Sequence, residues 1–372
     1  MDTTNRRHFV TALGAGALAA APCEAAPKTH AAKPLPSVKA RIGHELQGTM
    51  TDKMGAYLAR FGVDGVGCAA VQEDPARVYS TVDELKRARD LCERHKLTMD
   101  IAECALPTEN VDTQKHPAIN LGDGAQRDRD IEGFQIHIRN VAAAGIPCIK
   151  YALNLLGAMR NVLDYPGRGD ALYTGWKLAT APADLPLTKA GTVPADVFWE
   201  RITYFLERVV PVAAEYKVKL ALHPHDPGVP SSGYRGIQRV LGTVEGVKRF
   251  VQIHENPYHG LNFCQGTMSE MLQNPGVEIF DVIRWFGVRG KIFNVHFRNI
   301  RGHRDDFVET FPDEGDVDFV RAVKVYREVG YAGLLMPDHA PRFKDNPNGP
   351  LESFAFDFGY IRGLLQAEAH LT

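Results

Sequence analysis

Histidine, cysteine and aspartate side chains follow several short apolar runs in the second half of this sequence. The segment LALHPHDP places His223 and His225 after one run, and Cys264, His296 and Asp338 follow three later runs. A single histidine after a strand is more often a hydrogen-bonded structural residue than a ligand. Imidazole, thiolate and carboxylate together, however, suit manganese, iron, cobalt or zinc better than magnesium or calcium. We therefore expect His223, Cys264, His296 and Asp338 to bind a metal if the fold brings them together.

Eight short apolar runs alternate with segments of helical pattern, and these elements must position the candidate ligands. The expected strands lie within residues 40–46, 63–71, 97–105, 146–154, 218–223, 260–264, 291–297 and 333–338. The expected helices span residues 52–61, 81–95, 126–144, 195–217, 236–255, 268–288, 316–329 and 351–369. Helix start signals support several of them, such as STVDE from Ser80 and PADVFWE from Pro194.

Eight alternations of strand and helix predict an α/β fold, the (β/α)₈ TIM barrel. An open, doubly wound sheet is the alternative, but no GxGxxG follows an early strand. We expect residues 37–372 to form one barrel domain, with residues 154–194 as an inserted loop after the fourth strand that could cover the site. In such a barrel, catalytic groups gather at the carboxyl ends of the strands.

The first 36 residues have the character of an export signal and linker. Paired arginines in NRRHFVT precede the small-residue apolar run LGAGALAAA, a pattern typical of a twin-arginine signal peptide. A disordered basic tail is the alternative. The run is too short for a permanent membrane anchor, and no other stretch approaches ~18 uninterrupted apolar residues. We therefore expect a periplasmic enzyme, exported by the twin-arginine translocase and free of the membrane after signal cleavage.

Charge and cysteine usage exclude some classes of protein. Lys and Arg total 43 against 45 for Asp and Glu, without the basic stripe that nucleic acid binding requires, so we expect no nucleic acid partner. The six cysteines include no CxxC pair, and most lie inside apolar runs. Apart from Cys264, they read as small buried apolar residues and not as a disulfide framework.

Four motifs carry a family resemblance that runs from about residue 40 to the C-terminus. HPHDP from His223, GLNFCQGT from Gly260, VHFRNI from Val295 with the later FPDEGDVD, and PDH from Pro337 resemble mannonate dehydratases of the xylose-isomerase-like barrel class. The resemblance implies dehydration of D-mannonate to 2-keto-3-deoxygluconate with a divalent metal, typically manganese. It also implies that His223, Cys264, His296 and Asp338 are the ligands and that His339 is catalytic.

Dehydration of a sugar acid needs a base for the proton next to the carboxylate, an acid for the departing hydroxyl and a cation for the developing charge. His339 can serve as the base only if the chain turns after the eighth strand, because adjacent strand residues point to opposite faces. A structural role is its alternative.

Other polar residues at the same strand ends are candidates for binding the substrate. Arg298 and Asn299 could hold its carboxylate, since guanidinium binds carboxylate in a two-pronged geometry, or Arg298 could form a salt bridge. Lys150 and Glu103 could bind hydroxyl groups or form a structural pair. The acidic run DEGD, residues 313–316, is a helix cap or a segment that orients the HFRN loop.

The sequence departs from the family pattern at three places. His225 stands where the family usually has an acid, and PDHGH becomes PDHAP. A tyrosine that works with the catalytic histidine is replaced by Phe354 or Ala355, so we expect its role to pass to another group, such as Tyr360 or His225.

These departures keep two other functions open beside that of a metal-dependent sugar-acid dehydratase. One is a sugar isomerase or epimerase, which would use the same barrel and metal for enediol chemistry. The other is an exported sugar-binding protein without catalysis. A small sugar acid is the expected partner, and homo-oligomer formation is left open.

Overall fold

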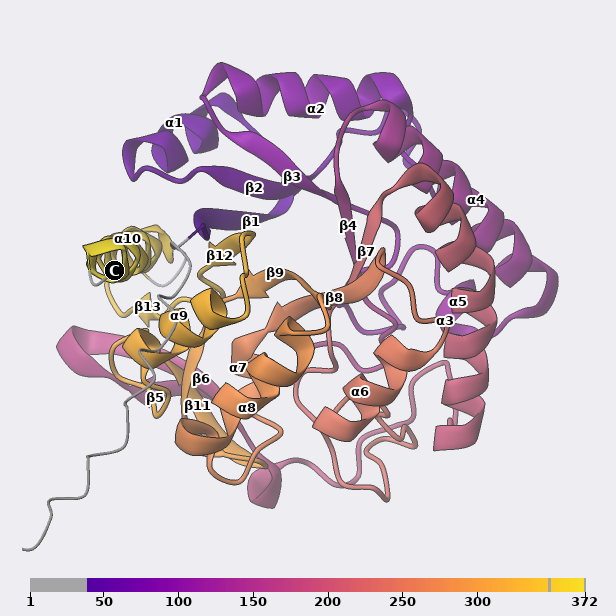
Figure 1. The fold of residues 1–372 in the computed structure, drawn as a ribbon. Helices are drawn as coiled ribbons and strands as arrows, with labels where there is room; N and C mark the ends of the chain where they lie inside the picture. The colour runs from indigo at the N-terminus through magenta and orange to yellow at the C-terminus, as the bar shows by residue number, and fades with distance from the viewer. Residues whose placement is uncertain (1–38, 347–348, 371–372) are drawn as a thin grey trace, which may run out of the picture. The chain divides into compact units, whose positions relative to one another are not determined.

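Eight parallel strands close into a barrel in the computed structural model, which describes residues 39–346 and 349–370 (Figure 1). The order around the barrel is β1-β12-β9-β8-β7-β4-β3-β2, and all eight predicted strands are confirmed. The barrel strands are β1 (Arg41–Thr49), β2 (Gly65–Ala69), β3 (Thr98–Glu103), β4 (Cys148–Tyr151), β7 (Lys219–Leu222), β8 (His259–Cys264), β9 (Ile292–His296) and β12 (Leu334–Met336). The predicted TIM barrel is therefore confirmed, and the predicted signal segment lies outside the described residues.

The helices surround the barrel, and several of them begin at signals that the sequence contains. They are α1 (Asp52–Arg60), α2 (Val82–Arg94), α3 (Ala118–Leu121), α4 (Gly124–Ala143), α5 (Ala195–Tyr216), α6 (Val244–Gln252), α7 (Gln265–Ser269), α8 (Pro275–Gly287), α9 (Phe319–Glu328) and α10 (Leu351–His370). Thr81 and Glu84 form a capping box before α2, and Pro194 precedes α5. The helix expected over residues 268–288 begins only at Pro275, because proline favours the first turn of a helix and disfavours helical backbone in the residue before it.

A second, smaller sheet was not predicted. It is built from β5 (Val162–Pro166), β6 (Ala171–Lys177), β10 (Asn299–His303), β11 (Asp306–Thr310) and β13 (Arg342–Phe343). β6 pairs antiparallel with β11, β13 and β5, so the segment expected as a loop contributes two strands (Figure 1). The pairing of β6 with β11 and β13 joins segments more than 100 residues apart and leaves no local sequence signal. The pairs β5–β6 and β10–β11 are local and were missed.

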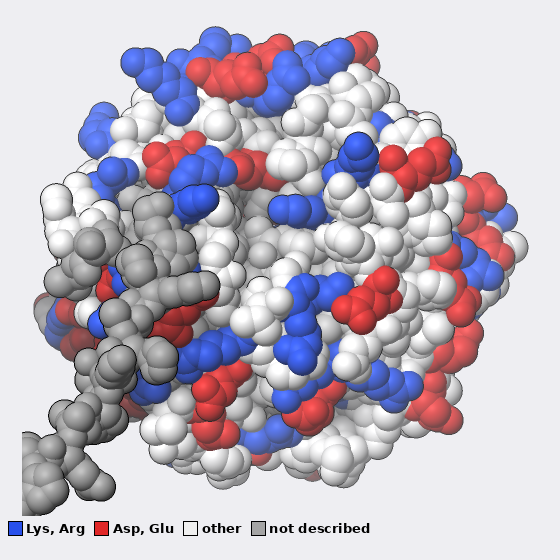
Figure 2. All heavy atoms as spheres, viewed as in Figure 1, with Lys and Arg blue, Asp and Glu red and all other residues white. Residues whose placement is uncertain are grey.

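The barrel strands are buried, whereas charged side chains lie on the outer surface of the molecule. Every residue of β8 is buried, as expected for a parallel strand covered on both faces. On the face drawn in Figure 2, Lys and Arg side chains are interspersed with Asp and Glu side chains. Within the described part of the chain, no helix combines the length and the apolar character needed to cross a membrane.

Candidate active site

The ends of four neighbouring barrel strands bring the predicted metal ligands together. His223 follows β7, Cys264 ends β8 and His296 ends β9, and one donor atom from each lies within 4.8 Å of the other two. Asp338 follows β12, and its Oδ2 lies 3.6 Å from Cys264 Sγ and 3.5 Å from His296 Nδ1. The barrel thus assembles one cluster of two imidazoles, one thiol and one carboxyl group.

Hydrogen bonds orient the two histidines of this cluster so that one nitrogen of each can bind a cation. His223 Nδ1 donates to the Pro224 carbonyl at 2.7 Å, which leaves a lone pair on Nε2. His296 Nε2 lies 2.5 Å from Glu45 Oε2, whereas its buried Nδ1 has no hydrogen-bond partner among the described residues. Buried nitrogens are rarely left unpaired, so this atom is a natural ligand. The donor set therefore fits a divalent metal of the manganese-to-zinc series.

Both acidic members of the cluster favour their charged, metal-binding forms. Burial alone would raise the pKa of the Cys264 thiol, but the Arg298 charge and the neighbouring His223 and His296 rings lower it well below its ordinary value. Burial also raises the pKa of the Asp338 carboxyl group, but the neighbouring histidines and the Arg298 charge lower it by more. The pKa of this group is therefore likewise well below its ordinary value.

Glu45 is a residue of this site that the sequence analysis missed. It lies in β1, where its carboxylate accepts from His296 Nε2 and contacts the Lys150 ammonium. A carboxylate behind a ligand histidine fixes the imidazole ring and increases its basicity. The available signal was the HEL segment near the end of the first expected strand, where Glu45 is a polar residue at a strand end like the other candidates.

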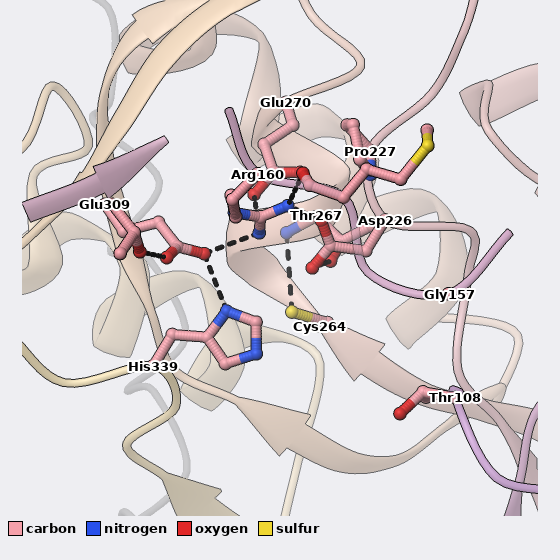
Figure 3. A network of polar contacts seen from close by, with 12 residues as sticks. Thr108, Gly157, Arg160, Asp226, Pro227, Cys264, Thr267, Glu270, Glu309 and His339 are labelled. Atoms are coloured by element: carbon pink, nitrogen blue, oxygen red, sulfur yellow. Dashed lines mark hydrogen bonds and ion pairs between the residues drawn. The ribbon is translucent and has the colours of Figure 1, made fainter. Parts of the chain in front are cut away.

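His339 reaches the site because the chain turns directly after Asp338. Its φ of 48° lies in the left-handed region, which fits the turn that the sequence analysis required. The side chain is 30 % exposed, and Nδ1 lies 2.6 Å from Glu309 Oε1. Figure 3 shows the Glu309 carboxylate between His339 and Arg160. Glu309 belongs to the unpredicted strand β11 and was also missed.

Arg298 belongs to a buried network of ion pairs, so its predicted role as a clamp for the substrate carboxylate is wrong. Its guanidinium contacts Glu309 and lies 2.9 Å from Glu270 Oε1 and 3.1 Å from Asp226 Oδ2. The side chain is only 1 % exposed. These carboxylates come from three segments that are far apart in the chain, so no local pattern indicates that they converge. Arg298 instead holds Glu309 in place and also contacts His339 directly, with Nη1 2.8 Å from His339 Nδ1.

Asn299 is likewise structural, which corrects its predicted role in substrate binding. Its amide donates to the carbonyls of Pro312 and Val317 at 2.8 and 2.9 Å. Asp316 Oδ2 accepts from the Gly302 amide at 2.7 Å. These bonds tie the DEGD segment to β10, in agreement with the expectation that this segment orients the HFRN loop.

His225 is a buried structural histidine, and its predicted catalytic role is not supported by its position. Its Nε2 donates to the Leu153 carbonyl at 2.8 Å, and its Nδ1 accepts from the Leu241 amide at 3.3 Å. Burial and the Arg239 charge lower the pKa of His225 to about 3. Both nitrogens are therefore used by the backbone, and the ring is neutral at neutral pH.

Lys150 and Glu103 lie on the wall of a cavity of about 500 Å³ at the carboxyl ends of the strands. The same wall includes His223, His296 and Asp338. Burial lowers the pKa of Lys150 to about 8 and raises the pKa of Glu103 to about 7. Both groups can therefore exchange protons near neutral pH.

No hydroxyl group replaces the family tyrosine at residues 354–355. Phe354 packs edge-on against His44, with ring centroids 4.8 Å apart. Tyr360 of α10, the suggested substitute, stacks on Phe356 and packs near Phe319 of α9. It does not line the cavity. Neither Tyr360 nor His225 therefore supplies the lost acid-base group.

Comparison with known proteins identifies the family to which this chain belongs. The sequence model of the D-mannonate dehydratase (UxuA) family matches residues 177–371, slightly more than half of the chain. The mannonate dehydratase of Thermotoga petrophila is 29 % identical over 345 residues, which cover 82 % of this chain and 91 % of the relative. Mannonate dehydratase 2 of Halalkalibacterium halodurans is 29 % identical over 305 residues, covering 74 % and 84 %.

The solved structures show the same fold. The mannonate dehydratase of Streptococcus suis superposes with a TM-score of 0.75 at 23 % identity, over 89 % of this chain and 95 % of that one. An L-ribulose 3-epimerase superposes less closely, with a TM-score of 0.54 at 15 % identity over 89 % and 96 %. The matched family segment contains all four candidate ligands and His339. Because the match covers more than half of the chain, the chain belongs to the D-mannonate dehydratase family.

Proposed function

We propose that this protein is a metal-dependent hydro-lyase that converts D-mannonate to 2-keto-3-deoxy-D-gluconate and water. Family membership and the names of the relatives support this reaction. The single observation that carries it is the placement of His339 beside the cluster of His223, Cys264, His296 and Asp338. A base next to a cation site is what removal of a proton α to a carboxylate requires.

His339 takes the proton from C2 in this mechanism. We assign to His339 the tautomer in which Nδ1 donates to Glu309 Oε1 at 2.6 Å, so that Nε2 carries the lone pair and acts as the base. Arg298 Nη1 lies 2.8 Å from the same Nδ1 and contributes its positive charge there, not a hydrogen bond. Removal of this proton and loss of the C3 hydroxyl give an enol, which becomes the 2-keto acid when C3 takes up a proton. When bound, the metal, for which we propose manganese, stabilises negative charge on the substrate oxygens.

Glu103 gives a proton to the C3 hydroxyl as it leaves. Its side chain lies on the same cavity wall as His339, and burial raises its pKa to about 7, so the protonated form is well populated at neutral pH. Lys150 lies beside Glu103 in the register of β4 with β3, its ammonium contacts Glu45, and it provides the positive charge for the substrate carboxylate. This assignment explains how the chemistry proceeds without the family tyrosine.

A keto-acid assay tests the proposal. Purified protein with manganese and D-mannonate should form a product that reacts with thiobarbiturate or semicarbazide, and His339→Gln should abolish it. A change in sugar stereochemistry without keto acid would favour the isomerase or epimerase. No turnover over a sugar-acid panel, with thermal stabilisation by a ligand, would favour the non-catalytic binding protein.

We also propose that residues 1–36 direct export of the folded protein to the periplasm. The motif NRRHFVT and the apolar run after it support this proposal. Arg6→Lys combined with Arg7→Lys should retain the precursor in the cytoplasm, whereas unchanged export of that variant would contradict a twin-arginine route.

A further inference from the structure

A second cavity adjoins the one that holds the candidate ligands. Its volume is about 880 Å³, and the two cavities share Glu45, Gln47, Asp338 and His339 on their walls. Of the four candidate ligands, only Asp338 lines it. The second cavity thus begins where the reacting carbons of the substrate must lie and extends away from the metal site.

The first cavity alone is large enough for a six-carbon sugar acid. Its volume of about 500 Å³ falls within the range of roughly 300–1,000 Å³ that is usual for small-molecule sites. The second cavity therefore provides room for another unit of similar size.

The wall of the second cavity combines apolar surface with polar groups in the manner of a sugar site. Met54, Leu172, Pro341 and Phe354 provide apolar contacts, and Phe354 occupies the region of the lost tyrosine. Aromatic and aliphatic side chains pack well against the C–H face of a pyranose ring, because that face is apolar. Thr49 and Thr174 line the same cavity. The Thr49 hydroxyl can hydrogen-bond to hydroxyl groups of the ring, and the Thr174 hydroxyl, which donates to Glu309, can accept a hydrogen bond from them.

His44 belongs to the apolar part of this wall. The residue is only 5 % exposed, and its ring packs edge-on against Phe354 and Phe358. Burial lowers the pKa of His44 to about 4, so the ring is neutral at neutral pH and adds no charge to the cavity.

The charges on the wall favour a neutral unit over a phosphate. Arg160 is already paired with Asp226 at 2.6 Å, and Arg342 with Asp164 at 3.2 Å. Glu45, Glu309 and Asp338 line the same cavity, so the wall carries acidic groups that disfavour an anionic unit.

We propose that the second cavity is a subsite for a sugar unit joined to O4 of the sugar acid, so that the preferred substrate is a disaccharide aldonate. This inference rests on the proposed dehydration. Because the cavities meet at His339, which takes the C2 proton, the attached unit must leave the chain close to C3, and O4 is the next oxygen. The glycosidic bond stays intact, and water is lost from C2 and C3 as before.

The direct test compares D-mannonate with 4-O-β-D-mannopyranosyl-D-mannonate, with manganese-loaded protein and keto-acid detection. We expect kcat/KM to be at least tenfold higher for the disaccharide acid. A kcat/KM equal to or below that of D-mannonate would overturn the proposal.

A bulky substitution in the second cavity separates subsite binding from the chemistry. Leu172→Trp should lower kcat/KM for the disaccharide acid at least tenfold and change that for D-mannonate less than twofold, because Leu172 lines only the second cavity. The matched control is Leu163→Trp on β5, where the residue is 57 % exposed and lies outside both walls. Equal losses on both substrates in Leu172→Trp would contradict the subsite.

A binding measurement distinguishes failure of the subsite from failure of the proposed reaction. If neither compound is dehydrated, the proposed function fails, and calorimetry then decides the subsite alone. Binding of the disaccharide acid at least tenfold tighter than that of D-mannonate, with the advantage lost in Leu172→Trp, would support the subsite. Equal binding of the two compounds would refute it.

Discussion

Glu309 Oε1 lies 2.6 Å from His339 Nδ1 and joins the β10–β11 hairpin to the loop after β12. The same carboxylate also contacts Arg298 and Arg160, which fix its position. A histidine that donates from Nδ1 to a carboxylate presents Nε2 as the base, and the carboxylate stabilises the imidazolium that forms. The small sheet therefore takes part in positioning the base.

Glu309→Gln should lower kcat on D-mannonate at least tenfold and change KM by less than about threefold, because an amide cannot stabilise the imidazolium. Steady-state kinetics at a temperature where circular dichroism shows a folded variant would measure this. Glu314→Gln is the control, since Glu314 bonds to the Tyr173 hydroxyl and lines neither cavity. Wild-type kcat in Glu309→Gln would contradict the role of Glu309.

His225 and His339 should respond in opposite ways to the same substitution. His339→Gln removes the base, so we expect activity to fall below detection with little change in thermal stability. His225→Gln weakens the hydrogen bonds to the Leu153 carbonyl and the Leu241 amide. We therefore expect the free energy of unfolding to fall by about 1–3 kcal/mol while kcat stays within threefold. Thermal melts and kinetics on both variants distinguish them. A large loss of kcat in a folded His225→Gln protein would restore a catalytic role for His225.

The dependence of kcat on pH tests whether Glu103 acts as the general acid. Burial raises the pKa of this carboxyl group to about 7, and it must be protonated to act as the acid. We therefore expect kcat to be high below pH 7 and to fall as pH rises through about 7. Glu103→Gln cannot donate a proton, so it should lower kcat and abolish this alkaline limb. An unchanged limb in Glu103→Gln would assign the titration to another group.

Metal replacement tests the sulfur ligand. The cobalt-loaded protein should show a thiolate-to-metal charge-transfer band in the near ultraviolet, because the low pKa of Cys264 favours the thiolate. Cys264→Ser should lose this band and bind the metal at least tenfold more weakly, as measured by elemental analysis after dialysis. Chelation should abolish activity in the wild-type protein, and manganese should restore it. A charge-transfer band that persists in Cys264→Ser would place the ion elsewhere.

The barrel and its ligand cluster were predictable because each depends on local features. Every barrel strand appears as a short apolar run, and the strand order of the fold places His223, Cys264, His296 and Asp338 at neighbouring ends. Closure of the barrel then determines their proximity.

The residues that support the site were not predictable in the same way. Glu309 and Arg160 meet because β11 pairs with β6, two segments about 130 residues apart in the chain. Arg298 was predicted to bind substrate because a guanidinium after a strand suits a carboxylate, but the nearest carboxylates belong to the protein itself. Such pairing depends on long-range geometry that one sequence does not reveal.

Proton NMR of the reaction in D₂O tests the central claim most directly. The manganese-loaded protein should convert D-mannonate to 2-keto-3-deoxy-D-gluconate with deuterium incorporated at C3, and His339→Gln should show neither product nor exchange. Formation of an epimeric sugar acid or a keto sugar without loss of water would contradict the proposed dehydration.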